Sequence, residues 1–110
     1  MSKSQRDKGK RGELDVAKLY QGLGGPYASA RRHLETRAID AGYDLDGCGD
    51  DVPEVKNRAR PVPVTTLFKI RVPVGGGHRV LWNKVNRAWV VTLDADRYLD
   101  LLKIEMGLNE

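Results

Sequence analysis

The chain has 110 residues, of which 40% are hydrophobic and 31% are charged, so we expect one domain over residues 1–110 with a single core. No apolar run approaches the roughly 20 residues that cross a bilayer. The basic N-terminus lacks the apolar segment of a secretory signal. The single cysteine, Cys48, excludes an internal disulfide and a cysteine-based zinc site. We therefore expect no membrane partner and a cytoplasmic location.

Acidic and basic side chains are segregated along the chain, whose formal net charge is +4. Between Arg37 and Lys56 every charged side chain is a carboxylate, whereas residues 55–93 contain no Asp or Glu. The basic side chains of the second stretch are Lys56, Arg58, Arg60, Lys69, Arg71, Arg79, Lys84 and Arg87. Residues 1–10 add a basic arm that we expect to be flexible. This segregation indicates a surface that faces a polyanion, although basic tails and strand edges often serve only solubility.

The first predicted element is a helix over residues 5–23, in which apolar residues recur at helical spacing. Glu13 projects from its buried face, where a carboxylate is unfavourable unless it is paired. Two interpretations stay open. Either Glu13 forms a salt bridge with Arg11 or Lys10, or it points into a metal or DNA site.

The order of the remaining elements predicts a mixed α/β layer structure. They are a strand at 28–33, a loop at 34–42, strands at 43–47 and 52–56, a short helix at 64–70, a hairpin of 79–82 and 88–93, and a final helix capped by Asp94. We expect this final helix to turn Tyr98, Leu101, Leu102 and Met106 towards the core and to end at Gly107.

Carboxylates cluster on the two central strands. The two-residue period of a strand places Asp44 and Asp46 on one face of the first, and Glu54 and Lys56 on one face of the second. Pro53 cannot donate a hydrogen bond to a neighbouring strand, so that part of the second strand is expected at an edge or a bulge.

This arrangement suits phosphodiester hydrolysis, in which Mg²⁺ held by a few carboxylates can activate water and stabilise negative charge. Asp44 and Glu54 are placed to meet across one ion, with the carbonyl of Val55 as a third ligand. Lys56 shares the face of Glu54, where it can orient or deprotonate the water or stabilise the developing charge. We prefer Asp44 to Asp46 as the ligand because Asp44 precedes an apolar residue.

Three motifs together resemble the PD-(D/E)XK nuclease superfamily, and within it the small archaeal and phage-type Holliday junction resolvases. They are Gly12-Glu13, Tyr43-Asp44-Leu45-Asp46-Gly47 and Glu54-Val55-Lys56. The similarity extends over about residues 8–105, with Tyr43 in place of the proline that often precedes the first Asp. It implies a restriction-endonuclease-like fold, in which helices flank a mixed central sheet. The whole chain would then be a single nuclease domain.

The resemblance also implies Mg²⁺- or Mn²⁺-dependent cleavage of DNA by a homodimer, in the host cytoplasm if the chain is phage-encoded. Asp44 and Glu54 match the metal ligands, Lys56 the catalytic lysine and Glu13 a helix glutamate of such resolvases. The expected DNA contacts are Lys8, Lys10 and Arg11, which match a basic arm, together with Arg31, Arg32, Arg58 and Arg60.

The expected function is therefore a structure-selective DNA endonuclease that resolves four-way junctions. One alternative is the same chemistry on single-stranded or flapped DNA, because the catalytic motif does not encode the preferred DNA structure. Another is a non-catalytic DNA-binding protein with this fold. A panel of substrates separates the first two possibilities, and metal dependence separates both from the third.

Overall fold

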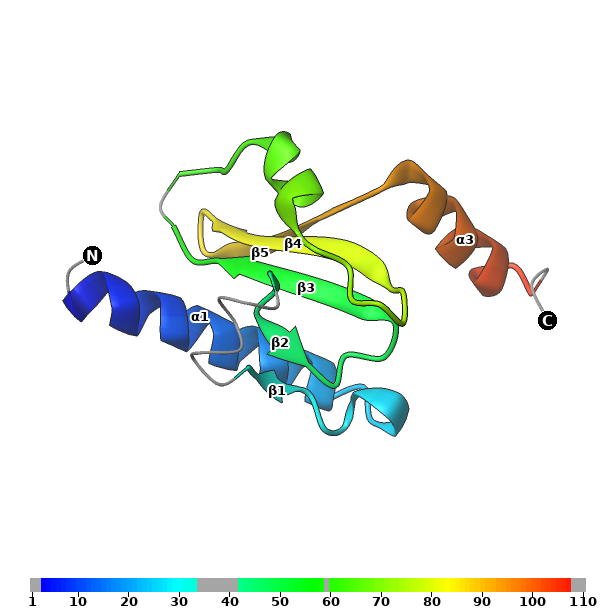
Figure 1. Cartoon of the computed structure of the whole chain (residues 1–110), viewed down its shortest axis with the longest axis horizontal. Coiled ribbons are helices and arrows are strands. Elements are labelled where there is room, and N and C mark those ends of the chain that lie inside the picture. The colour runs from blue at the N-terminus through cyan, green and yellow to red at the C-terminus, as the bar shows by residue number, and fades with distance from the viewer. Residues whose placement is uncertain (1–2, 34–41, 59, 108–110) are drawn as a thin grey trace.

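The structure, a computed structural model, describes residues 3–33, 42–58 and 60–107 (Figure 1). Its elements, with η for a 3-10 helix, are α1 (Lys3–Gln21), η1 (Gly25–Tyr27), β1 (Arg31–Arg32), β2 (Leu45–Asp46), β3 (Asp51–Lys56), η2 (Val64–Lys69), β4 (His78–Val85), β5 (Ala88–Leu93) and α3 (Ala95–Glu105). The predicted mixed α/β class is confirmed. Except for Gly42, the loop expected at 34–42 lies outside the described residues.

The strands expected at 28–33 and 43–47 are present but reduced to two residues each. β1 and β2 pair antiparallel, with Arg31 opposite Asp46 and Arg32 opposite Leu45. Gly47 ends this ladder with φ of 73°, and a Cβ at that position would lie 2.6 Å from the carbonyl oxygen of Ser29. The two short strands therefore form a separate two-stranded sheet, called here the β1–β2 clasp, and do not extend the main sheet.

The main sheet has the order β3-β4-β5, with β3 parallel to β4 and β4 antiparallel to β5. Residues 57–77 cross over between the parallel strands and carry η2. Pro53 lies in β3 at the sheet edge, as expected, and its carbonyl accepts a 2.8 Å hydrogen bond from the backbone N–H of Asp44. The missing N–H of the proline thus falls on the edge away from β4 and leaves the β3–β4 ladder intact.

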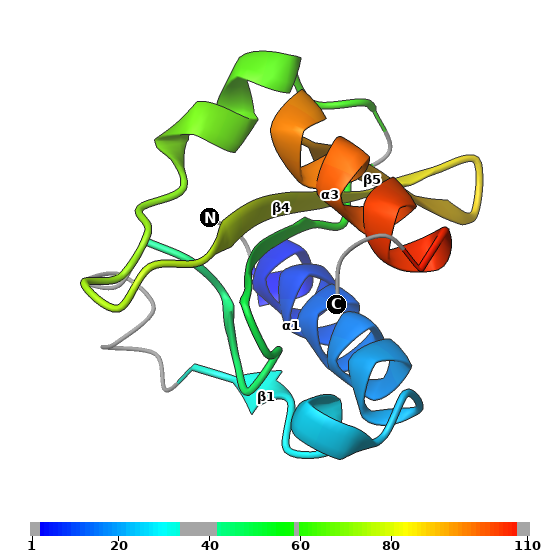
Figure 2. The ribbon, with the colours of Figure 1, turned by 90° about the vertical axis from the view of Figure 1, so that its right-hand side faces the viewer.

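Alternate residues of β3 contribute to two separate apolar clusters. Val55 packs in a cluster with Val16 and Tyr20 of α1, whereas Val52 packs with Leu67 and other residues beneath η2. Burying a side chain of this size contributes about 1.5–3 kcal/mol to folding. Figure 2 shows the resulting layers, with α1 on one side of the sheet and η2 on the other. Glu54 and Lys56 share the parity of Val52 and therefore lie on the η2 side.

A polar network links α1, the sheet and α3. The buried Tyr20 hydroxyl donates to Asp51 Oδ2 over 2.8 Å and accepts from Trp82 Nε1 over 3.2 Å. Burial is the main cause that raises the pKa of Tyr20, so the hydroxyl stays protonated. Trp82 and Trp89 lie edge to face with each other and pack, partly buried, against the α1 cluster. Arg97 Nη2 lies 3.7 Å from Asp51 Oδ1 and ties the last helix to this network.

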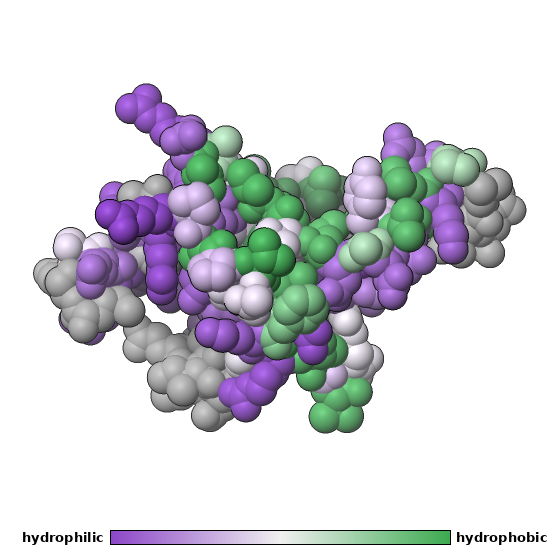
Figure 3. Space-filling view, turned by 90° about the horizontal axis from the view of Figure 1, so that it is seen from above, coloured by the Kyte–Doolittle hydropathy of each residue, from purple (hydrophilic) through white to green (hydrophobic). Residues whose placement is uncertain are grey.

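The prediction that the final helix packs on the core is wrong. Tyr98, Leu101 and Met106 are 55%, 39% and 66% exposed, and no described residue of α3 is buried. The cause is the path of the chain, because β5 leads α3 away from the sheet (Figure 1). In Figure 3 the end of the molecule that carries α3 projects from the rest and shows apolar side chains on its surface. Asp94 precedes the helix but makes no capping hydrogen bond with its side chain, and Gly107 follows the helix with φ of 74°. Neither described helix is long and apolar enough to cross a membrane.

Candidate active site

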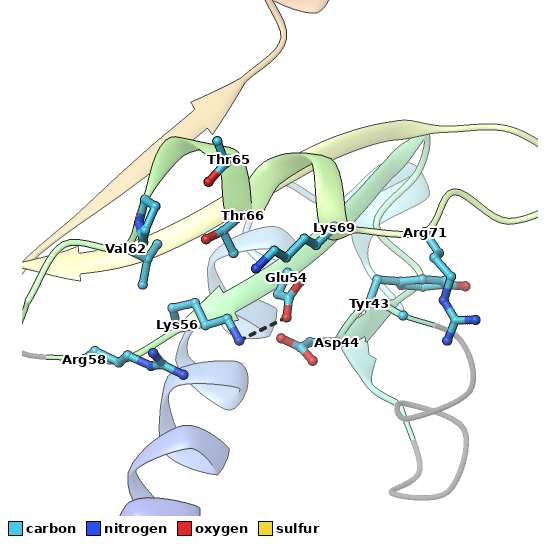
Figure 4. A pocket seen from close by; sticks show the side chains of 12 residues that line it. Tyr43, Asp44, Glu54, Lys56, Arg58, Val62, Thr65, Thr66, Lys69 and Arg71 are labelled. Atoms are coloured by element: carbon cyan, nitrogen blue, oxygen red, sulfur yellow. Dashed lines mark ion pairs between the residues drawn. The ribbon is translucent and has the colours of Figure 1, made fainter.

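A cleft of about 540 Å³ lies between the end of β3, the roof formed by η2, and the segment that leads into β2 (Figure 4). Its charged lining consists of two carboxylates and four cations, which are Asp44, Glu54, Lys56, Arg58, Lys69 and Arg71. The acidic and basic segments of the sequence therefore meet in one cavity. Lys69 and Arg71 belong to the basic stretch but were not predicted as site residues, because only the fold brings Lys69 of η2 over β3 and sets Arg71 against Gly42.

Backbone contacts fix Asp44 against the exposed edge of β3. Its N–H donates to the carbonyl of Pro53, and its Oδ2 accepts a 2.7 Å hydrogen bond from the N–H of Val55. This pair of contacts on either side of Glu54 holds the Asp44 carboxylate beside that residue. The local cause is the strand edge, where the outward backbone groups of β3 have no neighbouring strand in the main sheet.

Glu54 and Lys56 form an ion pair on the cleft face of β3. Lys56 Nζ lies 3.1 Å from Glu54 Oε1, and the two side chains are only 20% and 26% exposed, glutamate first. Figure 4 shows this pair with the Asp44 carboxylate turned towards it. The expected grouping of Asp44, Glu54 and Lys56 is therefore present in the structure.

The protonation of Asp44 reflects its burial first and the nearby negative charge second. Burial and the nearby carboxylates of Glu13 and Glu54 raise the pKa of Asp44 to about 7, although the Val55 N–H and Lys56 act in the opposite direction. Glu13 on α1 is thus close enough to act on Asp44 electrostatically. A site with this balance gains from any added cation, because the cation relieves the repulsion between the carboxylates.

The sequence suggested Arg11 or Lys10 as the partner of Glu13, but neither residue is its partner in the structure. Glu13 Oε1 instead accepts a 2.6 Å hydrogen bond from Arg32 Nε across the gap between α1 and β1. The pairing joins residues 19 positions apart, so the helical repeat could not identify it. Arg32, expected to contact DNA, is engaged by this carboxylate, whereas Arg31 is exposed.

Asp46 and Asp51 make structural contacts outside the cleft. Asp46 Oδ2 lies 2.8 Å from Nδ1 of the buried His33, on the β1–β2 clasp. Asp51 accepts from Tyr20. Asp44, and not Asp46, therefore faces Glu54. Cys48 is buried and burial raises the pKa of its thiol to about 12, which fits a small structural residue and not a nucleophile.

The donor set of the cleft fits one hard divalent cation. Among the described residues no group of three His, Cys, Asp or Glu side chains is placed to hold a metal. Mg²⁺, however, keeps several waters and commonly uses only one or two protein carboxylates. Asp44 and Glu54 are the two carboxylates that line the cleft, whereas Val55, whose carbonyl the sequence suggested as a third ligand, is not among the lining residues.

The expected DNA contacts divide between two places. Arg58 lines the cleft described above and also a second one, which contains Lys8 and Arg11. Lys10 and Arg60 are exposed. Contact of these residues with DNA stays a prediction.

Comparison with protein-family models, with curated proteins and with solved structures finds no match. The resemblance to PD-(D/E)XK nucleases therefore depends on the motif residues themselves and on how the chain arranges them.

Proposed function

We propose that the chain is a Mg²⁺- or Mn²⁺-dependent DNA endonuclease of restriction-endonuclease-like architecture. The observation that carries this proposal is the meeting of Asp44, Glu54 and Lys56 in one cleft lined by cations. The preferred substrate is the four-way junction, cut by a homodimer, because a two-fold dimer presents two equivalent sites to a two-fold substrate.

Each group in the cleft has a role in this chemistry. A divalent ion held by Asp44, Glu54 and the Val55 carbonyl would supply Lewis-acid stabilisation of the scissile phosphate. Lys56, held by Glu54 at 3.1 Å, is placed to orient a water or to stabilise the negative charge that develops. Arg58 and Lys69 bind the flanking phosphates, whose charge they complement.

The same charges argue against a DNA-binding protein without activity. Carboxylates in a phosphate-binding cleft repel the ligand, and burying Asp44 disfavours its ionised form. A site that only binds phosphate gains nothing from either feature. A metal-dependent hydrolase does require the carboxylates, since they hold the ion that phosphate then approaches, and the ion offsets the cost of ionising Asp44.

The test is cleavage of a synthetic four-way junction beside matched duplex, single-stranded and flapped DNA, in Mg²⁺, Mn²⁺ or EDTA. Paired, symmetric, metal-dependent nicks at the junction would support the proposal in full. Cutting of flaps or single strands would keep the nuclease and reject the resolvase, and no cutting would favour a binding protein.

The matched variants are Glu54→Gln and Glu105→Gln, the second of which removes an exposed carboxylate from α3. We expect Glu54→Gln to lower the cleavage rate by about 100-fold or more while DNA binding in EDTA is retained or strengthened. Glu105→Gln should cleave like the unaltered chain. Equal losses of binding and cleavage in Glu54→Gln would contradict the assigned role.

A further inference from the structure

A second cleft, which we call the basic cleft, lies between α1 and the turn that joins β4 to β5. It encloses about 370 Å³ and is lined chiefly by Lys8, Arg11, Asp15, Arg58, Lys84 and Arg87. Five of these six side chains are cationic. Lys8, Arg11 and Asp15 recur at intervals of three and four, so they share one face of α1.

The wall between α1 and β3 is a close, specific contact. Asn57 Nδ2 donates a 2.9 Å hydrogen bond to the carbonyl of Lys8. Gly12 makes the approach possible, since a Cβ there would lie 2.7 Å from the Asn57 Cβ. This contact therefore fixes the position of the α1 cations relative to the end of β3.

The opposite wall carries a cation in an unfavourable backbone conformation. Asn86 and Arg87 have φ of 50° and 68°, which defines a two-residue hairpin turn whose second position favours glycine. Arg87 occupies that position. Lys84 Nζ lies 5.5 Å from the centre of the Trp89 ring, which orients the second cation of this wall. The turn geometry therefore does not account for the arginine, whose side chain lines the basic cleft.

The basic cleft adjoins the active-site cleft, because Arg58 lines both. A phosphate chain that enters the active-site cleft and passes Arg58 meets Lys84 and Arg87 next. No aromatic side chain on which a base could stack is among the described residues that line the basic cleft, so it suits phosphate contacts and not base recognition.

We infer that the basic cleft binds the backbone phosphates of the nucleic-acid strand that lies in the active-site cleft, and that Lys84 and Arg87 supply the contacts. This inference deepens the proposed function and rests on it. The binding is independent of base sequence and adds phosphates to the footprint beyond the scissile one.

The test is the salt dependence of DNA binding, measured in EDTA so that no cleavage occurs. Arg87→Gly suits it, because glycine fits the turn and the fold should be kept. The logarithm of the binding constant falls with the logarithm of the salt concentration, and each phosphate contact that is lost makes this slope shallower by about 0.7–0.9. We expect the slope to become shallower by about one for Arg87→Gly and shallower still for the double variant Lys84→Ala/Arg87→Gly. The exposed control Lys103→Ala should leave the slope unchanged.

A slope for Arg87→Gly equal to that of Lys103→Ala would overturn the inference. If the unaltered chain cleaves DNA and Arg87→Gly shows no change in slope, only the basic cleft is rejected. If the chain cleaves nothing but Arg87→Gly does lower the slope, the phosphate contact stands and the proposed nuclease fails. A lower thermal midpoint for Arg87→Gly would mark a folding defect, and Arg87→Asn, which also tolerates the turn, then decides.

Discussion

The active-site cleft and the basic cleft meet at Arg58 and are both rich in cations, but they treat negative charge differently. The active-site cleft holds Asp44 partly buried, with a raised pKa and a second carboxylate beside it. The basic cleft contains one carboxylate, Asp15, and that residue is exposed. Positive charge alone is enough to attract a polyanion, whereas a crowded carboxylate pair gains stability from protonation or from a bound cation. The comparison separates residues expected to act in chemistry from residues expected to act in binding.

The largest effect expected from this comparison is on the cleavage rate. Lys56→Gln removes the ammonium that lies 3.1 Å from Glu54 Oε1, and we expect the rate at saturating DNA to fall by about 100-fold or more. Binding should weaken only slightly, since Arg58, Lys69 and Arg71 still line the cleft. Single-turnover cleavage beside equilibrium binding measures both. A variant that binds poorly but cleaves at the normal saturating rate would place Lys56 with the binding residues instead.

The second expected effect is on stability, measured without metal. The pKa of Asp44 is raised from 3.8 to about 7, so the folded state binds its proton more tightly than the unfolded state. The proton on Asp44 therefore stabilises the folded state fully below about pH 4, and this contribution declines as the pH rises and is lost above about pH 7. Asp44→Asn should remove this dependence and raise the free energy of unfolding at pH 8 by about 1–3 kcal/mol.

Asp15→Asn is the matched control for this measurement. Its carboxylate is exposed on the basic cleft, and we expect a change within about 0.5 kcal/mol at either pH. Denaturant unfolding in EDTA at pH 5 and pH 8 compares the two variants. If Asp44→Asn is less stable than the unaltered chain at pH 8, the ionised carboxylate of Asp44 stabilises the fold and the prediction is wrong.

The smallest effect concerns the contact between α1 and the end of β3 that forms one wall of the basic cleft. A Cβ at Gly12 would lie 2.7 Å from the Asn57 Cβ, whereas a Cβ at Gly9 would meet nothing within 4 Å. Both residues lie in α1, where alanine is favoured over glycine by about 0.5–1 kcal/mol. We expect Gly9→Ala to stabilise the chain by that amount and Gly12→Ala to destabilise it by about 1 kcal/mol. Thermal unfolding tests the pair, and equal shifts would show that the close contact yields without strain.

The sequence is most informative where the residues that matter lie on one strand. The two-residue period by itself puts Glu54 and Lys56 on a common face, and the absence of an N–H in Pro53 indicates an edge. Both inferences depend only on local geometry, which the backbone of a strand determines.

Contacts between distant segments could not be obtained in this way. Whether Asp44 or Asp46 faces Glu54 depends on how the chain enters β2, and the partner of Glu13 lies on another element. The apolar stripe of α3 suggested a core helix, yet the direction of β5 carries the helix off the sheet. The roles of Lys69 and Arg71 arise from the position of η2 above β3. Each outcome is decided by tertiary packing, which the periodicity of a helix or strand in the sequence does not predict.

The crossover between β3 and β4 has a consequence for the folding rate. A parallel pair needs a connection of a dozen or more residues, and here that connection carries the roof of the active-site cleft. Pairing of β3 with β4 must therefore wait until a long loop closes, an entropic barrier that slows folding. The cleft is complete only when that loop has closed. A partly folded chain consequently has no assembled cleft before the sheet is formed.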